Sequence, residues 1–286
     1  MTGIDNKINI KSSENGILLQ NCTDFDLKQT LSCGQAFRWQ ELSDGSFRGV
    51  IGRNIGHISQ MPQGILFHSM TNEEFMRVWY DYFDFGRNYA EIKKQFSSDP
   101  ILAKAISYAP GIRVLKQDSW EALCSFIISQ NNNVKRIEGI VQRLCETFGE
   151  PLDDGFYTFP APEVLAKAPI ADMIPLRAGF RARYLLDAAK KVVSGEVRLA
   201  ELPVLPIEEA RTELQKITGV GIKVAECALL YGCGRAECFP VDVWIKRAME
   251  QLFPNGLPEC AQEFAGIAQQ YIFHFVRTCP DALVRN

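Results

Sequence analysis

Two residues of the sequence, Lys223 and Asp242, are of types that together carry out nucleophilic chemistry at a carbon bearing a leaving group. Lys223 stands at the start of an expected helix, where the positive end of the helix dipole disfavours a charged amine. A nucleophilic amine has to be neutral, so this position suits one. Asp242 supplies a carboxylate that stabilises positive charge on a reacting group. Taken singly, each residue has a simpler interpretation: a surface lysine that extends into solvent, and an aspartate that caps the helix after Pro240-Val241.

The segment Gly219-Val220-Gly221 is expected to join two helices in a tight hairpin. Gly219 and Gly221 provide backbone angles that the apolar residues around them adopt only with strain. The amides at the start of the second helix are then unpaired and point outward, where they can bind a phosphate oxygen. The sequence therefore predicts a helical hairpin at about residues 208–232 that contacts a phosphate backbone.

The hairpin, the lysine and the Pro240-Val241-Asp242 loop together resemble the helix-hairpin-helix DNA glycosylase superfamily. The signature of that superfamily is this hairpin, a Gly/Pro-rich loop and an aspartate. The resemblance implies that Lys223 attacks the sugar C1′ as the glycosidic bond breaks. It further implies that Asp242 stabilises the positive charge that builds on the sugar.

No cofactor is expected to be required. By the resemblance, three carbonyl groups of the hairpin form a site for a monovalent or divalent cation, and they belong to Gln215, Ile217 and Val220. Some relatives carry an iron–sulfur cluster in a four-cysteine loop after the aspartate. Here only Cys260 and Cys279 follow it, so no cluster is expected. The nine cysteines are scattered through apolar segments, which indicates small buried residues in a reducing compartment rather than a disulfide framework.

Composition and charge are those of a soluble globular protein. The 286 residues are enough for two domains, with 47% hydrophobic and 23% charged residues. A net charge of −3 and a pI near 5.8 exclude DNA binding by bulk positive charge, so any DNA contacts must be local. The stretch 1–14 is polar and no apolar run is long enough to span a membrane. We expect a monomer that binds double-stranded DNA inside the cell, in the cytoplasm and nucleoid or in a nucleus, without membrane association.

The order of secondary-structure signals predicts an α+β protein with two domains. Residues 1–112 are dominated by strand signals, at 16–22, 36–42, 46–52, 54–60 and 65–68, with a short helix or turn at 27–32 and a helix at 75–83. Residues 113–286 are expected to be all helical, with helices at 120–129, 134–148, 162–168, 183–194, 206–217, 224–231, 243–252 and 258–276. This order resembles the 8-oxoguanine DNA glycosylase branch of the superfamily, which places a TATA-binding-protein-like antiparallel sheet before the helical glycosylase core.

The resemblance to this branch implies a set of residues that hold the damaged base. Gly34 matches the glycine whose carbonyl reads N7, which carries a hydrogen in 8-oxoguanine and a lone pair in guanine. Gln269 matches the residue that bonds the Watson–Crick edge, while Phe273 and Cys227 match those on the two faces of the base. From the residues alone, a glycine in a turn before a strand is the preferred interpretation of Gly34, and a core phenylalanine and a buried cysteine remain open for Phe273 and Cys227.

A second set of residues is implied to contact the rest of the DNA. Asn131 matches the residue that fills the space left by the extruded nucleotide, and Arg136 matches one that contacts the orphaned partner base. Phe180 matches a wedge that holds the duplex open, and Arg181 matches an arginine that reads the opposite cytosine. Helix capping by the asparagine run and core packing of Phe180 remain open as structural interpretations.

The sequence departs from the branch at two linked positions. Animal members have a histidine where this chain has Trp244, and the aspartate that pairs with it is Val276 here. A phosphate contact at Trp244 is therefore in question, although an indole N–H donates one hydrogen bond.

The expected function is a bifunctional glycosylase and lyase that excises 8-oxoguanine opposite cytosine from duplex DNA, through a Schiff base and β-elimination. Two alternatives remain at this point: an alkylated-purine glycosylase, which activates water and has no hairpin lysine, and a non-catalytic DNA-binding hairpin protein.

Overall fold

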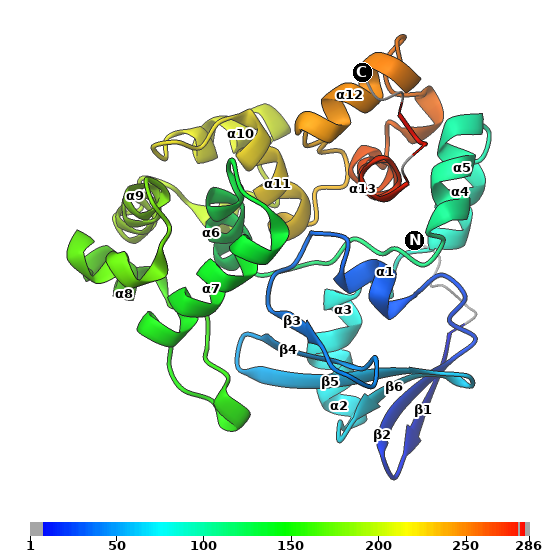
Figure 1. Ribbon diagram of the computed structural model, residues 1–286, viewed down its shortest axis with the longest axis horizontal. Coiled ribbons are helices and arrows are strands. Elements are labelled where there is room, and N and C mark those ends of the chain that lie inside the picture. The colour runs from blue at the N-terminus through cyan, green and yellow to red at the C-terminus, as the bar shows by residue number, and fades with distance from the viewer. Residues whose placement is uncertain (1–7, 280, 284–286) are drawn as a thin grey trace.

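A computed structural model describes residues 8–279 and 281–283, so the first seven residues of the polar stretch 1–14 lie outside the described part of the chain. The chain forms a sheet lobe and a larger helical lobe (Figure 1). The sheet has six antiparallel strands in the order β1-β2-β6-β5-β4-β3. The strands are β1 (Asn9–Ser13), β2 (Gly16–Gln20), β3 (Trp39–Glu41), β4 (Phe47–Ile51), β5 (Asn54–Met61) and β6 (Gly64–His68). The expected antiparallel sheet is confirmed.

Both expected hairpins are present in the sheet. Glu41 pairs with Phe47 across one turn, and Met61 pairs with Gly64 across the other. Strand β1 was not expected from the sequence, because it is an edge strand with almost every residue exposed and so carries no alternation of polar and apolar side chains.

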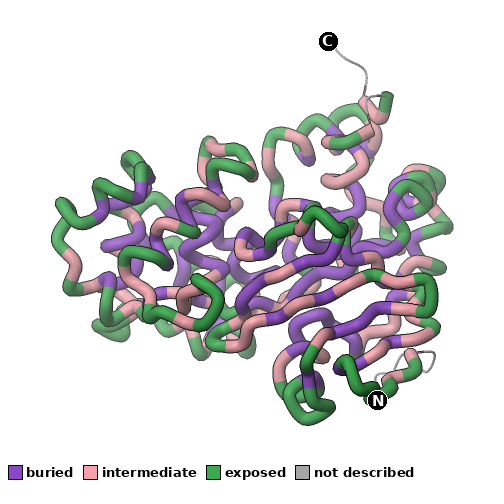
Figure 2. The backbone as a smooth tube through the Cα atoms, turned by 60° about the horizontal axis from the view of Figure 1, so that its bottom comes forward, coloured by how far each residue is buried: buried purple, intermediate pink, exposed green. Residues whose placement is uncertain are grey.

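Helices cover one face of the sheet. Helix α1 (Leu27–Leu31) precedes β3, and the expected helix after Thr71 runs through α2 (Asn72–Glu74), the π-helical turn η1 (Phe75–Trp79) and α3 (Tyr80–Tyr82). Thr71 and Glu74 form a reciprocal capping box at its start. Phe75 and Trp79 then bury their rings against Phe67 of β6. In Figure 2 the buried (purple) segments gather in the interior of the molecule and the exposed (green) segments lie on its outside.

The helical lobe confirms the second half of the expected architecture. Its helices are α4 (Tyr89–Phe96), α5 (Pro100–Tyr108), α6 (Ser119–Ser129), α7 (Val134–Phe148), α8 (Pro162–Lys167), α9 (Arg181–Val193), α10 (Ile207–Gln215), α11 (Ile222–Cys233), α12 (Val243–Leu252) and α13 (Ala265–Thr278), with short turns η2 (Asp153–Gly155), η3 (Ile170–Leu176), η4 (Leu199–Glu201) and η5 (Glu259–Ala261). Helices α4 and α5 precede residue 112, yet their side chains belong to the helical core and α5 lies beside α13 (Figure 1). Helices α4 and α5 therefore pack with the helical lobe, although they lie in the part of the sequence that was assigned to the sheet domain.

The expected helix at 258–276 is interrupted. Turn η5 ends at Ala261 and α13 begins at Ala265, because Gly266 is fixed by close contact with α11 and a neighbouring loop. The Gly266 N–H donates to the Ala236 carbonyl at 2.8 Å, and a Cβ at Gly266 would lie 2.3 Å from Leu230. The backbone must turn before this contact, so one continuous helix cannot form.

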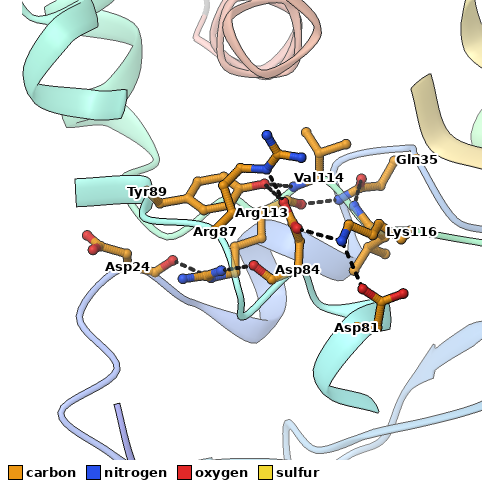
Figure 3. Close-up of polar contacts among 10 residues, drawn as sticks. Asp24, Gln35, Asp81, Asp84, Arg87, Tyr89, Arg113, Val114 and Lys116 are labelled. Carbon is orange, nitrogen blue, oxygen red and sulfur yellow. Dashed lines mark hydrogen bonds and ion pairs between the residues drawn. The ribbon is translucent and has the colours of Figure 1, made fainter. Parts of the chain in front are cut away.

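A buried arginine joins the two lobes. Arg113 lies in the segment between α5 and α6, and its guanidinium stands 4.4 Å from the centroid of Tyr89, in the helical core, and 5.1 Å from that of Phe85, in the sheet core. It donates to the Asp84 carbonyl at 2.7 Å and to the Asp24 carbonyl at 3.2 Å (Figure 3). Burying a cation requires this degree of hydrogen bonding. The lobes therefore meet through a fixed polar contact.

Candidate active site

A cavity of about 410 Å³ lies where the loop after α1 meets the helical lobe, and six expected site residues line it together. They are Gly34, Lys223, Cys227, Asp242, Gln269 and Phe273. The walls also include residues that the sequence did not single out, namely Phe37, Phe126, Ser129, Tyr231 and Arg277. Loop, hairpin helix, capped helix and final helix thus converge on one space.

The Lys223 amine faces this cavity. Gly221 caps α11, which places Lys223 in the first turn of the helix with its side chain partly buried. Its Nζ donates to Ser129 Oγ at 3.3 Å and lies 5.4 Å from the centroid of the Phe126 ring. Ser129 in turn donates its hydroxyl hydrogen to the Phe126 carbonyl at 2.8 Å, so its lone pairs face the amine. The amine is held beside an aromatic ring rather than in bulk solvent.

Asp242 both caps α12 and lines the cavity. Its Oδ1 accepts from the N–H groups of Trp244 at 3.0 Å and Ile245 at 2.8 Å, which is the expected N-cap. Among the described residues, no side chain or backbone N–H donates a hydrogen bond to Oδ2 of Asp242. Within the same residues, no ion pair joins this carboxylate to Lys223. One carboxylate oxygen is thus fixed by the helix and the other remains available to a ligand.

The residues expected around the base lie close to one another. Gly34 has a positive φ of 88°, and a Cβ there would lie 3.7 Å from Cε1 of Phe273 and 3.0 Å from Nη1 of Arg277. Arg277 stands 4.9 Å from the centroid of the Phe273 ring. Gln269 is only 4% exposed. These side chains form a slot with an aromatic wall, a cation and a buried amide.

The Cys227 side chain is a neutral thiol. Burial raises the pKa of the Cys227 thiol to about 11, and the neighbouring Lys223 only partly offsets this effect. A neutral thiol is a poor nucleophile at physiological pH. Cys227 therefore forms part of the cavity wall and is not suited to act as a nucleophile.

Three of the residues expected to face DNA are exposed and lie outside the cavity lining. Phe180 is 50% exposed and packs edge-on against Tyr184, as a wedge requires. Asn131 is exposed with φ of 47° in the loop before α7, and Arg136 is exposed in the first turns of α7. The cavity is lined by Asn132 and Asn133 rather than by Asn131. The roles of these residues on DNA stay predictions.

Arg181 is buried, whereas its expected contact with DNA requires an exposed side chain. It is 3% exposed, and its guanidinium donates to the carbonyls of Gln130, Asn131 and Ala178. Burial lowers the pKa of Arg181, and the nearby Arg136 adds to this effect. In this structure the guanidinium therefore holds the loop before α7, and reading an opposite cytosine would require it to leave these carbonyls.

The hairpin between α10 and α11 is braced by α9. The Thr218 N–H donates to Asp187 Oδ2 at 2.7 Å, and Lys191 donates to the Lys216 carbonyl at 2.5 Å. Burial acts to raise the pKa of Asp187, but the hydrogen bond from Thr218 and the pairing with Lys191 outweigh it, so the pKa is lowered. The turn carrying Gly219 and Gly221 is thereby fixed against the helix that presents the exposed Phe180.

We expect alanine at Gly219 to lower stability far more than alanine at Gly221. Gly219 has φ of 79°, and a Cβ there would lie 2.2 Å from the Tyr184 ring, whereas a Cβ at Gly221 meets nothing within 4 Å. Strain and displacement of the ring are expected to cost about 1–3 kcal/mol in Gly219→Ala. Thermal unfolding of the two variants checks this, and equal midpoints would contradict the close packing of Gly219 on Tyr184.

The described residues contain no group of three or more His, Cys, Asp or Glu side chains that could hold a metal ion. At the hairpin, the Ile217 carbonyl accepts from the Val220 N–H at 3.0 Å. Trp244 lines the cavity, and the Arg247 guanidinium stands 5.8 Å from its ring centroid. Within the described part of the chain, no helix has the length and apolar character needed to cross a membrane.

Comparison with known proteins agrees with this geometry. Residues 17–123 match the 8-oxoguanine DNA glycosylase N-terminal domain, and residues 124–262 match the HhH-GPD superfamily of base excision DNA repair proteins. The chain is 32% identical to an N-glycosylase/DNA lyase of Saccharomyces cerevisiae, over 81% of this chain and 69% of the yeast protein.

Two solved structures are similar over nearly the whole chain. MBOgg1, solved with a low affinity DNA ligand, is 40% identical with a TM-score of 0.88, covering 95% of this chain and 98% of that one. The 8-oxoguanine glycosylase/lyase of Clostridium acetobutylicum, solved with duplex DNA containing cytosine opposite 8-oxoguanine, is 34% identical with the same TM-score and the same coverage. The cavity, the capped carboxylate and these matches together place the chain in the 8-oxoguanine DNA glycosylase family of the helix-hairpin-helix base excision repair proteins.

Proposed function

We propose that this protein is a bifunctional DNA glycosylase and abasic-site lyase that excises 8-oxoguanine from duplex DNA opposite cytosine. The observation that carries the proposal is the cavity itself, in which an amine, a carboxylate, a glycine turn and a buried amide face one another. The relative with cytosine opposite 8-oxoguanine in its DNA supports the choice of lesion and partner base.

The proposed reaction begins with Lys223. The neutral amine attacks C1′ of the extruded nucleotide while the bond from C1′ to the base nitrogen breaks and the base leaves with that electron pair. Asp242, held by its cap, stabilises the positive charge on the sugar through its free oxygen. The Lys223 nitrogen, now bonded to C1′, loses a proton; the bond from C1′ to the ring oxygen then breaks, the oxygen takes up a proton, and a C1′=N Schiff base remains. The excised base takes a proton from C2′, a C2′=C3′ double bond forms, and the bond from C3′ to the phosphate oxygen breaks, which cuts the strand.

The direct test is excision of 8-oxoguanine placed opposite each of the four bases. The expected result is product with a cleaved strand, fastest opposite cytosine. Excision of 3-methyladenine without strand cleavage would instead favour the alkylated-purine alternative, and binding without product would favour a non-catalytic hairpin protein. Lys223 argues against both alternatives, because neither requires an amine in the cavity.

Alanine at Gly34 is expected to slow excision of 8-oxoguanine at least tenfold. The added Cβ would sit in a strained backbone region and crowd Phe273 and Arg277, which displaces the carbonyl that reads N7. Cleavage at a preformed abasic site, which has no base, should change little. The matched control is Gly45→Ala, with φ of 81° in a turn where a Cβ meets nothing within 4 Å. Equal losses on both substrates would show that Gly34 has no role in reading the base.

For the hairpin carbonyls of Gln215, Ile217 and Val220, we propose a bound monovalent or divalent cation that completes a contact to a DNA phosphate. The Ile217 carbonyl already accepts one hydrogen bond, and a carbonyl oxygen has a second lone pair for a cation. Dependence of DNA affinity on the identity of the cation at constant ionic strength tests this. We further propose that the protein acts as a monomer on DNA inside the cell.

A further inference from the structure

The carbonyl of Gly34 differs from those of its neighbours in its hydrogen bonding. The Ser32 carbonyl accepts from Arg277 Nη2 at 3.5 Å, the Cys33 carbonyl from Gln270 Nε2 at 3.3 Å, and the Gln35 carbonyl from Gln117 Nε2 at 2.7 Å. Among the described residues, no hydrogen bond reaches the Gly34 carbonyl. Within residues 32–35, all of which the structure describes, the Gly34 carbonyl is thus the one acceptor left unpaired, and Gly34 lines the cavity.

A glycine does not fix the direction of its own carbonyl. Without a Cβ it adopts positive and negative φ with similar ease, so the direction has to be imposed by contacts on either side. After Gly34, the Gln35 side chain is fully buried and is held by the Thr30 and Arg113 carbonyls and the Leu115 N–H, a contact region seen in Figure 3. Before Gly34, the Cys33 thiol donates to the Thr30 carbonyl at 3.2 Å, and the Cys33 carbonyl accepts from Gln270.

Gln270 is itself held in one orientation. Its Oε1 accepts from the Tyr231 hydroxyl at 2.5 Å, which leaves its Nε2 to donate to Cys33. Burial raises the pKa of Tyr231 well above its ordinary value, so the phenol stays a donor. Gln270 is 1% exposed and does not line the cavity, so it acts only through other residues.

The same hydroxyl also connects to the residue expected to bond the base edge. Tyr231 lies in the cavity wall, stacked on Phe126 with centroids 5.0 Å apart, and its Oη is 3.5 Å from Gln269 Oε1. Gln269 and Gln270 are neighbours on α13. One phenol therefore stands between the amide that meets the base and the amide that holds the loop.

We propose that Gln270, oriented by Tyr231, is a positioning residue that aims the Gly34 carbonyl and so sets the discrimination between 8-oxoguanine and guanine. The inference rests on the proposed function, because it assumes that this carbonyl reads N7 of the base. Loss of the Gln270 contact frees the peptide before Gly34, and the carbonyl then loses its fixed direction. Recognition of the lesion weakens, whereas contacts to the DNA backbone remain.

The test measures affinity in a Lys223→Gln background, which prevents turnover. Dissociation constants are determined for duplexes with 8-oxoguanine, guanine or a tetrahydrofuran abasic-site analogue opposite cytosine. Gln270→Met keeps the volume of the side chain without the amide, and Tyr231→Phe removes only the hydroxyl. We expect the preference for 8-oxoguanine over guanine to fall on the order of tenfold in Gln270→Met and by less in Tyr231→Phe, with abasic-site affinity unchanged.

The matched control is Tyr271→Phe. Tyr271 is the next residue of α13, is equally buried, and donates its hydroxyl to the Ile112 carbonyl at 3.0 Å rather than to Gln270 or to a carbonyl of residues 32–35. It should lower the unfolding temperature without changing the preference.

An unchanged preference in Gln270→Met would overturn the inference, and if that variant does not fold, an unchanged preference in Tyr231→Phe would do so. An equal loss in Tyr271→Phe would also overturn it. Absence of any preference in the parent background would overturn the proposed function together with this inference.

Discussion

Replacement of Lys223 by glutamine is expected to abolish covalent trapping on 8-oxoguanine DNA by borohydride and to slow excision by a factor of at least about 10³. Glutamine is similar in length but has no basic nitrogen, so neither attack on C1′ nor a Schiff base can occur. The amide can still accept and donate near Ser129, so the cavity wall should persist. Sodium borohydride trapping and single-turnover excision measure the two effects.

DNA affinity separates loss of chemistry from loss of structure in this variant. Lys223→Gln should retain binding to lesion DNA within a few-fold, because the substitution leaves the backbone amides of the hairpin and the exposed Phe180 unchanged. The control is Lys104→Gln, which removes the same charge from an exposed position on α5 outside the cavity. Trapping that survives in Lys223→Gln would show that another amine is the nucleophile.

Replacement of Asp242 by asparagine is expected to slow excision by about 10²–10³ while leaving folding nearly unchanged. Asparagine caps a helix as well as aspartate does, so the bonds from the N–H groups of Trp244 and Ile245 should remain. What is lost is the negative charge that faces the sugar. Single-turnover rates and thermal unfolding, measured on the same preparation, distinguish the two.

A second aspartate in the chain provides the control for capping alone. Asp118 caps α6 with the same pattern, since its Oδ1 accepts from the N–H groups of Trp120 at 3.0 Å and Glu121 at 2.9 Å, and it does not line the cavity. Asp118→Asn should leave excision unchanged. If Asp242→Asn behaves in the same way, the carboxylate is a helix cap and nothing more.

The residues of the cavity could be predicted from the sequence when their function follows from a local motif. Lys223 follows a glycine turn and Asp242 follows Pro240-Val241, so the positions of both on helix ends could be inferred from a few neighbouring residues. Cys227 lies one helical turn after Lys223, and Phe273 lies one turn after Gln269, so each pair shares a helix face, and the cavity contains all four residues.

The residues that support the cavity could not be predicted in this way. Their contacts form only after four separate elements have packed together. The pairs are Ser129 with Lys223, Tyr231 with Gln269, and Gln270 with Cys33. Arg277 had a signal that the sequence offered, since it lies one helical turn after Phe273.

Two parts of the fold were missed, each for its own physical reason. Strand β1 is polar because it lies at an edge, and periodicity detects only strands with a buried face. Helices α4 and α5 are short, although the Asp99-Pro100 pair at the start of α5 is a recognisable start signal.

The burial of Arg181 also could not be predicted. It depends on carbonyls contributed by another loop, and no local sequence pattern indicates that contact.

The cavity takes its glycine carbonyl from the loop after α1 and its amine from the hairpin helix α11, and these two segments are connected through Gln270, which bonds Tyr231 of that helix and the Cys33 carbonyl of that loop. Substitutions that alter the packing between this loop and this helix would change the direction of the Gly34 carbonyl without altering Lys223. Preference for a different damaged base can therefore drift during evolution by substitutions far from the reacting carbon, while the strand-cutting step is inherited intact.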